Sequence, residues 1–202
     1  MLDVEAPYPS SSRRVLLTID LTSSVAEEAL ALDPPPSLII SYHPPIFSGL
    51  KSLTLKNPLQ ASLLRCAARG ISVFSPHTSV DAAVGGVNDF LAQAFGASAS
   101  VRTLRPTDAN SPLRDLEPVE GEGRIVTLNP PLSLDGVVSS VKKHLGLPFV
   151  QLGRSTIGKP EVSTVAICAG SGGSVFKGVS ADLLWTGELS HVSYIRSKII
   201  DY

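Results

Sequence analysis

The sequence predicts an α/β fold with mixed, largely parallel sheets. Two observations support this prediction. Short apolar runs with the length of buried strands alternate with segments of helical character. Turn and cap residues also fall where the two patterns meet, for example Gly70 directly after the helical segment 57–69. A strand–helix–strand alternation of this kind is typical of parallel crossover units.

The first half of the chain contains three predicted strands and three predicted helices. The strand 14–19 is almost continuously apolar, as expected for a strand that is buried on both faces. Residues 20–24 supply turn and N-cap chemistry for a helix over 25–32, which the following prolines stop. The other predicted elements are strands at 37–41 and 71–74 and helices at 57–69 and 81–95.

The second half begins after residues 103–123, which are rich in Pro, Asp, Glu and Asn and predict a loop or linker. Apolar residues at three-to-four spacing then predict a helix over 133–145. Apolar runs predict strands at 123–128, 148–152, 163–168 and 183–186. The predicted organisation is therefore a first α/β lobe over 1–102, a linker over 103–123 and a second α/β segment over 124–202.

Composition excludes several classes of protein. The chain has 202 residues, 43% of them hydrophobic, which is enough apolar surface to bury a core. The formal net charge is −1 and the basic residues are scattered, which argues against a nucleic-acid surface. No apolar run reaches the roughly 18 residues of a membrane span, and the first residues do not have the pattern of a targeting signal. The two cysteines lack motif spacing and predict buried thiols in a reducing compartment, so we expect a location in the cytoplasm, with the nucleus as a second possibility.

The candidate site residues follow predicted strands. His43 comes just after the strand 37–41, and His77 and Asp81 follow the strand 71–74. In an open α/β sheet, ligands and metals usually bind at the carboxyl ends of the strands. Imidazole and carboxylate together suit divalent zinc, iron or manganese. These residues therefore predict a metal site.

Several motifs occur in a fixed order along the chain. They are Tyr-His-Pro-Pro-Ile-Phe at 42–47, His-Thr with Asp-Ala-Ala at 77–83, Gly-Val-Asn-Asp with Leu-Ala at 86–92, Gly-Ser-Gly at 170–172, and Thr-Gly-Glu with Ser-His at 186–191. In this order and spacing the chain resembles the NGG-one-interacting-factor-three-like family, in its eukaryotic form. Bacterial members of that family are often described as type 2 GTP cyclohydrolase I.

The resemblance implies two α/β lobes, a dinuclear metal centre in a cleft, and subunits that assemble as homo-oligomers. Carried over residue by residue, His43 would be a metal ligand and Asp81 a second, bridging ligand. Tyr42, His77 and Ser171 would lie in the second shell or against the substrate. Glu188 and His191 would act as catalytic residues that bind substrate or move protons.

The chain also departs from the family pattern. Tyr42 stands where family members frequently have a second histidine, and a phenol is a poor ligand at neutral pH because it titrates at about pH 10. A C-terminal strand with a Gly-His segment and its ligands has no match after His191, and the N-terminal helix has none before the first strand. We therefore expect a chain that is shortened at both ends.

Each candidate residue has a structural alternative. His43 could hydrogen-bond its own loop, Asp81 could be the N-cap of the following helix, and Glu188 could occupy an exposed helix N-terminus. The Gly-Ser-Gly-Gly-Ser turn at 170–174 could be a tight turn without any ligand.

Two functions remain open from the sequence. One is a metal-dependent hydrolase that acts on a nucleotide-like or phosphorylated small molecule. The other is a non-catalytic protein-interaction or transcription-related scaffold with an incomplete metal site.

Overall fold

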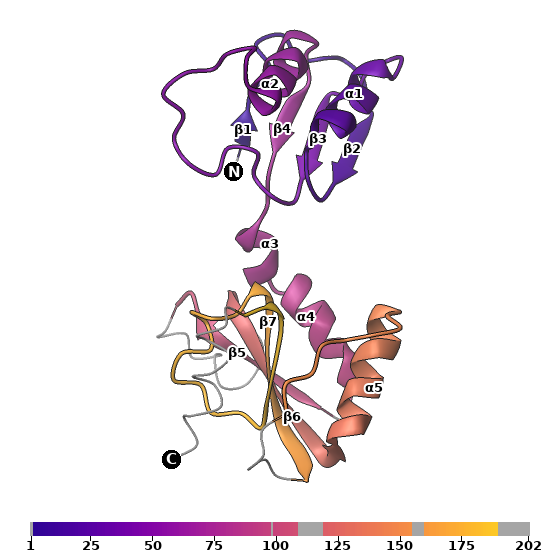
Figure 1. The fold of residues 1–202 in the computed structure, drawn as a ribbon, viewed down its shortest axis with the longest axis vertical. Coiled ribbons are helices and arrows are strands. Elements are labelled where there is room, and N and C mark those ends of the chain that lie inside the picture. Colours follow the sequence, from indigo (N-terminus) through magenta and orange to yellow (C-terminus); the bar gives the residue numbers. More distant parts are fainter. Residues whose placement is uncertain (1, 98, 109–118, 155–159, 190–202) are drawn as a thin grey trace. The chain divides into compact units, whose positions relative to one another are not determined.

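The computed structural model describes residues 2–97, 99–108, 119–154 and 160–189. Its contacts divide the chain into two compact units, Met1–Ser79 and Val80–Tyr202, and each is considered by itself (Figure 1). Each unit contains a four-stranded sheet with parallel and antiparallel pairs, which confirms the predicted mixed α/β fold class.

The first unit is a sheet covered by helices on one face. Its strands are β1 (Leu2–Val4), β2 (Val15–Thr18), β3 (Leu38–Ser41) and β4 (Ser72–Phe74), in the order β1-β4-β3-β2. The strands β2, β3 and β4 are parallel, and β1 adds an antiparallel edge. The helices α1 (Ser23–Ala31) and α2 (Pro58–Ala68) share one core with the sheet, formed by buried residues that include Ala29, Ile39, Leu63, Cys66 and Val73.

Parallel pairing explains where the candidate residues of this unit lie. The register joins Ile39 to Leu16 and to Val73, so β2, β3 and β4 end at the same edge of the sheet. The segments after these three strands therefore lie near one another.

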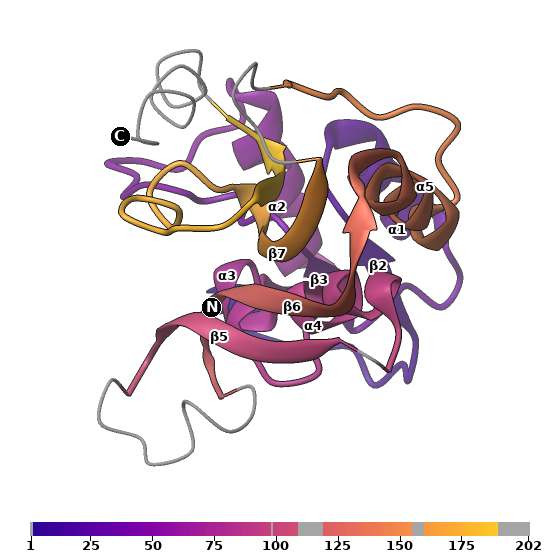
Figure 2. The same cartoon turned by 90° about the horizontal axis from the view of Figure 1, so that it is seen from below.

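The second unit is a sheet that is covered on both faces. Its strands are β5 (Ser100–Pro106), β6 (Gly121–Ser133), β7 (Glu161–Ser171) and β8 (Leu183–Glu188), paired in that order. Figure 2 shows β5 beside β6. The helices α4 (Val87–Ala92) and α5 (Leu134–Leu145) pack on the face that carries Val126, Val165 and Ile167. Val175 and Phe176 cover Ala166 and Cys168 on the other face.

Most predicted elements are present, with ends that shift by a few residues. The predicted cap Gly70 follows α2, directly after its C-cap residue Arg69, and has a φ of 74°, in the left-handed region. Two further caps are present: the Asn57 side chain accepts hydrogen bonds at the start of α2, and Gly146 has the left-handed conformation at the end of α5. Thr22 caps α1, within the segment that predicted this chemistry.

The prediction that the first long apolar strand is buried on both faces is wrong. In the described sheet β2 lies at the edge, and Leu17 is 74% exposed on the face opposite the helices. Apolar composition shows strand propensity here, but it cannot show the position of the strand in the sheet.

The prediction of a single helix over 81–95 is also wrong. The chain forms α3 (Thr78–Ala82), a turn through Gly85 and Gly86, α4, and the 3₁₀ helix η1 (Gln93–Phe95). Gly85 adopts a φ of 75°, which a continuous helix does not allow. The segment 148–152 is not a strand, and its Pro148 lacks the N–H that a sheet ladder requires.

The domain boundaries differ from the predicted ones. The division falls after Ser79, whereas the sequence predicted a first lobe over 1–102, because α4 and η1 pack on the second sheet. The predicted linker 103–123 contains the end of β5 and the start of β6, and residues 109–118 lie outside the described part. The sequence did not predict β1. Among the described residues, no helix has the length and apolar character needed to cross a membrane.

Candidate functional site

In the first unit, His43 is held at the carboxyl edge of the sheet. The loop that begins at Tyr42 follows β3, and the backbone N–H of His43 donates to the carbonyl of Ile19 at 3.0 Å. The buried hydroxyl of Ser41 donates to the carbonyl of His43 at 2.8 Å. These two bonds fix the backbone of His43 beside the end of β2.

The imidazole of His43 is oriented by Asp20. Its Nδ1 lies 2.9 Å from Oδ1 of Asp20, and the two side chains are 49% and 63% exposed. Because a carboxylate can only accept a hydrogen bond, Nδ1 carries the proton. Nε2 is then the nitrogen left to bind a ligand, which is the arrangement commonly found for metal-ligating histidines.

Asp20 was missed as a site residue by the sequence reasoning, which assigned it a turn or cap role. The helix cap is Thr22 instead. The signal that could have found Asp20 is its place just after a strand that pairs with β3, since neighbouring parallel strands present their following residues at one edge.

His77 joins His43 in a cluster of rings. The backbone N–H of His77 donates to the carbonyl of Tyr42 at 3.1 Å, and His77 has a φ of 44°, in the left-handed region. The ring of His43 lies 4.9 Å from that of Tyr42 and 5.9 Å from that of His77, between centroids. Phe47 adds an exposed ring 6.1 Å from His77. The structure thus brings together three of the predicted residues, and we call these four rings the aromatic cluster.

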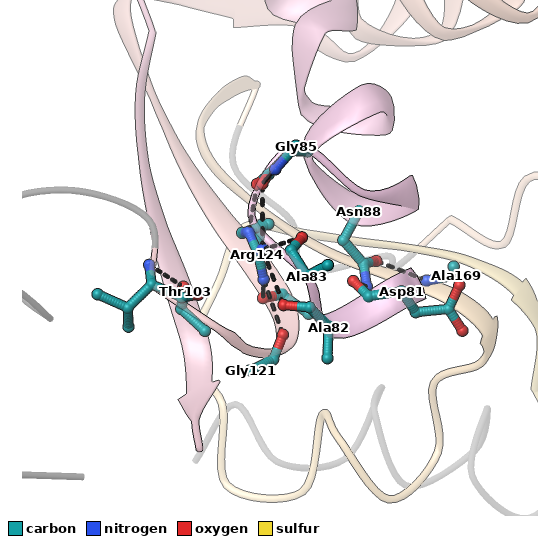
Figure 3. Close-up of polar contacts among 12 residues, drawn as sticks. Asp81, Ala82, Ala83, Gly85, Asn88, Thr103, Gly121, Arg124 and Ala169 are labelled. Atoms are coloured by element: carbon teal, nitrogen blue, oxygen red, sulfur yellow. Dashed lines mark hydrogen bonds and ion pairs between the residues drawn. The ribbon is translucent and has the colours of Figure 1, made fainter. Parts of the chain in front are cut away.

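In the second unit, Asp81 lies inside the short helix α3. It is not an N-cap: the N-cap of the next helix, α4, is Gly86. The backbone carbonyl of Asp81 accepts a hydrogen bond from Nδ2 of Asn88 at 2.9 Å. The Oδ1 of the same Asn88 accepts from the backbone N–H of Ala169 at 2.8 Å, so Asn88 ties Asp81 to the end of β7 (Figure 3).

A buried ion pair lies close to this link. The side chain of Arg124 is fully buried in β6, and its guanidinium pairs with the carboxylate of Asp89 in α4. Figure 3 shows the guanidinium also directed at backbone carbonyls of the connection before α4. Both Asn88 and Asp89 belong to a motif that carried the family resemblance, although neither was predicted to have a role at the site.

Ser171 and Glu188 are neighbours at the same end of the second sheet. They are paired in the parallel register of β7 and β8, and both are exposed. The carbonyl of Glu188 accepts from the N–H of Gly172 at 3.4 Å. Glu188 is the last residue of β8, and the residues that would form a following helix lie outside the described part. His191 lies outside the described residues.

The Cys168 thiol is buried and protonated at neutral pH, which makes it a poor nucleophile. Burial and, to a lesser extent, the negative charges of Asp81 and Glu122 raise the pKa of its thiol from 9.0 to about 11. Burial also raises the pKa of the Cys66 thiol. Both thiols are free and buried, as predicted.

The donor chemistry of His43 suits a divalent metal, because Asp20 holds its ring in the ligating tautomer. A complete set of ligands is not visible, however. Within the described ranges, no group of three or more His, Cys, Asp or Glu side chains is placed to hold a metal ion.

Comparisons with known proteins place the chain in a family. Residues 5–200 match the model of Duf34/NIF3 (NGG1p interacting factor 3). The chain is 48% identical over 190 residues to the NIF3 homolog of Schizosaccharomyces pombe, covering 93% of this chain and 67% of that protein. It is 38% identical to NGG1-interacting factor 3 of Saccharomyces cerevisiae, again covering 67% of the relative, and 30% identical to human NIF3-like protein 1, covering 71%.

Solved structures share the fold. A Bacillus cereus protein related to NIF3 aligns with a TM-score of 0.71 and 20% identity, over 98% of this chain and 79% of that one. Reduced HcgD from Methanocaldococcus jannaschii aligns with a TM-score of 0.66 and 21% identity, over 92% and 67%. At these low sequence identities, the structural likeness shows a shared fold and carries no conclusion about function.

We predict that neither cysteine reacts in the native protein. N-ethylmaleimide at about pH 7.5 should label Cys66 and Cys168 only after unfolding in denaturant, because reaction requires an accessible thiolate. Rapid native labelling, read by intact-mass spectrometry, would contradict this.

The same pKa shift predicts a pH dependence of stability. In a Cys66→Ala variant, the Cys168 thiol ionises near pH 9 when unfolded but only near 11 when folded. The free energy of unfolding should therefore fall as the pH rises from 9 towards 11. A Cys66→Ala, Cys168→Ala double variant is the control and should lack this part of the decline.

Proposed function

The chain belongs to the Duf34/NIF3 family, and on that premise we propose that it binds divalent metal ions, with His43 and Asp81 among the ligands. The observation that supports this most strongly is the hydrogen bond from Nδ1 of His43 to Asp20. It leaves Nε2 as the donor atom, in a segment exposed enough to admit an ion.

The metals that suit these ligands are zinc, iron and manganese, two per chain by the family resemblance. A bound pair would act as a Lewis acid and lower the pKa of water, which is the chemistry of metal-dependent hydrolysis. We propose a hydrolase acting on a nucleotide-like or phosphorylated small molecule, in the manner of GTP cyclohydrolase.

In this proposal the residues of the chain have three roles, which are orienting the ligand His43, lining the substrate site and transferring protons. Asp20 holds the proton on Nδ1 of His43 and fixes the plane of its ring. His77 and Tyr42, in contact with that ring, line the place where a substrate would approach. Glu188 is an exposed carboxylate next to Ser171 and could transfer a proton, and His191 is proposed for the same task from the sequence alone.

A second function is a protein-interaction or transcription-related scaffold, in a homo-oligomer or with other proteins. It is favoured by the name of the yeast relative, an interacting factor, and by the replacement of a histidine by Tyr42. In the first unit, Leu17 is exposed in the edge strand β2 and Ile19 is exposed directly after it, and exposed apolar edges favour pairing with another chain. Either function is compatible with the cytoplasm or the nucleus.

The metal content of the purified protein tests the proposal. Elemental analysis should find about two divalent ions per chain, and fewer in His43→Ala and in Asp81→Asn, with the lowest content when both changes are combined. The control is Asp33→Asn, an exposed aspartate that leaves both proposed ligands unchanged. Metal at background level in the wild type would contradict the hydrolase and favour the scaffold.

The role of Asp20 makes a separate prediction. Asp20→Asn removes the negative charge that favours the ligating tautomer, so metal affinity should fall by about 10- to 100-fold. Titration against a chromophoric chelator measures the change. Asp33→Asn, which alters net charge equally, should leave the affinity unchanged; an equal loss in both variants would show that only net charge matters.

A further inference from the structure

The short helix α3 carries Asp81, yet it has no apolar anchor of its own. It spans five residues, and none of them is buried. An isolated helix of this length is not stable in water. Some other interaction must therefore hold Asp81 in place within the second unit.

Asn88 supplies the first such interaction. Its side chain is only 1% exposed and uses both ends of its amide, one towards the carbonyl of Asp81 and the other towards the N–H of Ala169. A buried amide with both ends satisfied is rigid and costly to misplace. The backbone of Asp81 is thereby linked to the carboxyl end of β7.

Arg124 and Asp89 supply the second interaction. Nη2 of Arg124 donates towards the carbonyls of Ala83 at 3.3 Å and Ala82 at 3.5 Å, the two residues that follow Asp81. Oδ2 of Asp89 accepts from the N–H of Gly85 at 2.6 Å. The segment 82–85 is thus held at three backbone atoms by one ion pair.

The pair itself is firmly fixed. Nη1 of Arg124 donates to the carbonyls of Gly121 at 2.8 Å and Gly123 at 2.9 Å, in its own strand. The guanidinium is therefore joined to β6 on one side and to the connection after α3 on the other. A buried ion pair adds little to stability compared with apolar packing, so stability alone does not explain it well.

We propose that Asn88, Asp89 and Arg124 are positioning residues that fix Asp81 for metal binding. This inference rests on the proposed function of Asp81 as a ligand. A side chain binds a metal ion tightly when the protein already holds that side chain in position. Residues that hold a ligating side chain without touching the metal therefore commonly have a strong effect on metal affinity.

The test compares two network variants with a control matched in stability. The variants are Asn88→Ala and Arg124→Lys, since lysine keeps the charge but loses the planar fork that reaches several acceptors. The control is Val137→Ala, which creates a cavity in the helix-covered core of the same unit. Thermal unfolding of all three confirms that each is folded and that the control loses a similar amount of stability.

Two readouts are measured on the full chain well below the unfolding temperature. Zinc affinity, from competition with a chelator, should fall by about tenfold or more in both network variants and change less than about twofold in the control. Amide hydrogen exchange of residues 81–86 in the metal-free protein should accelerate in the network variants and not in the control.

The outcomes separate this inference from the function on which it rests. Equal loss of affinity and equal exchange in Asn88→Ala and Val137→Ala would overturn the positioning role. Absence of zinc binding in the wild type would overturn the proposed function instead, and the exchange data would still decide whether the network holds the segment of Asp81.

Discussion

In the second unit, the position of the candidate ligand Asp81 depends on the buried ion pair between Arg124 and Asp89. Desolvating a guanidinium is costly, and the cost is offset here by a carboxylate that is 14% exposed and by carbonyls of β6. Once the pair has formed, its remaining hydrogen-bonding capacity goes to the backbone after α3. A five-residue helix without buried residues thus gains a defined position, and Asp81 with it.

In the first unit too, a carboxylate fixes the candidate ligand, but this contact is smaller and more exposed. A carboxylate after one parallel strand orients an imidazole after the next, and the N–H of His43, which donates to the carbonyl of Ile19, keeps the two segments together. His77 follows the third strand, β4, and its backbone N–H donates to the carbonyl of Tyr42, which places it beside His43. Parallel pairing of β2, β3 and β4 is therefore what assembles the aromatic cluster.

The sequence predicted the residues at strand ends but not the residues that hold them. His43 and His77 follow apolar runs, and a local pattern is sufficient to find them. Arg124 could not be found in this way, because an arginine within a strand ordinarily indicates an exposed position, and its burial depends on a partner 35 residues away. The same limit explains β2: its composition predicted a strand, whereas its place at the edge depends on the rest of the sheet.

X-ray absorption spectroscopy of the zinc-loaded protein shows whether this chain binds a divalent metal through the oriented imidazole of His43 and a carboxylate. We expect nitrogen and oxygen ligands at about 2.0–2.2 Å, with an outer-shell imidazole signal that His43→Ala removes. Sulfur scatterers at about 2.3 Å, or an imidazole signal that survives in His43→Ala, would contradict this mode of binding.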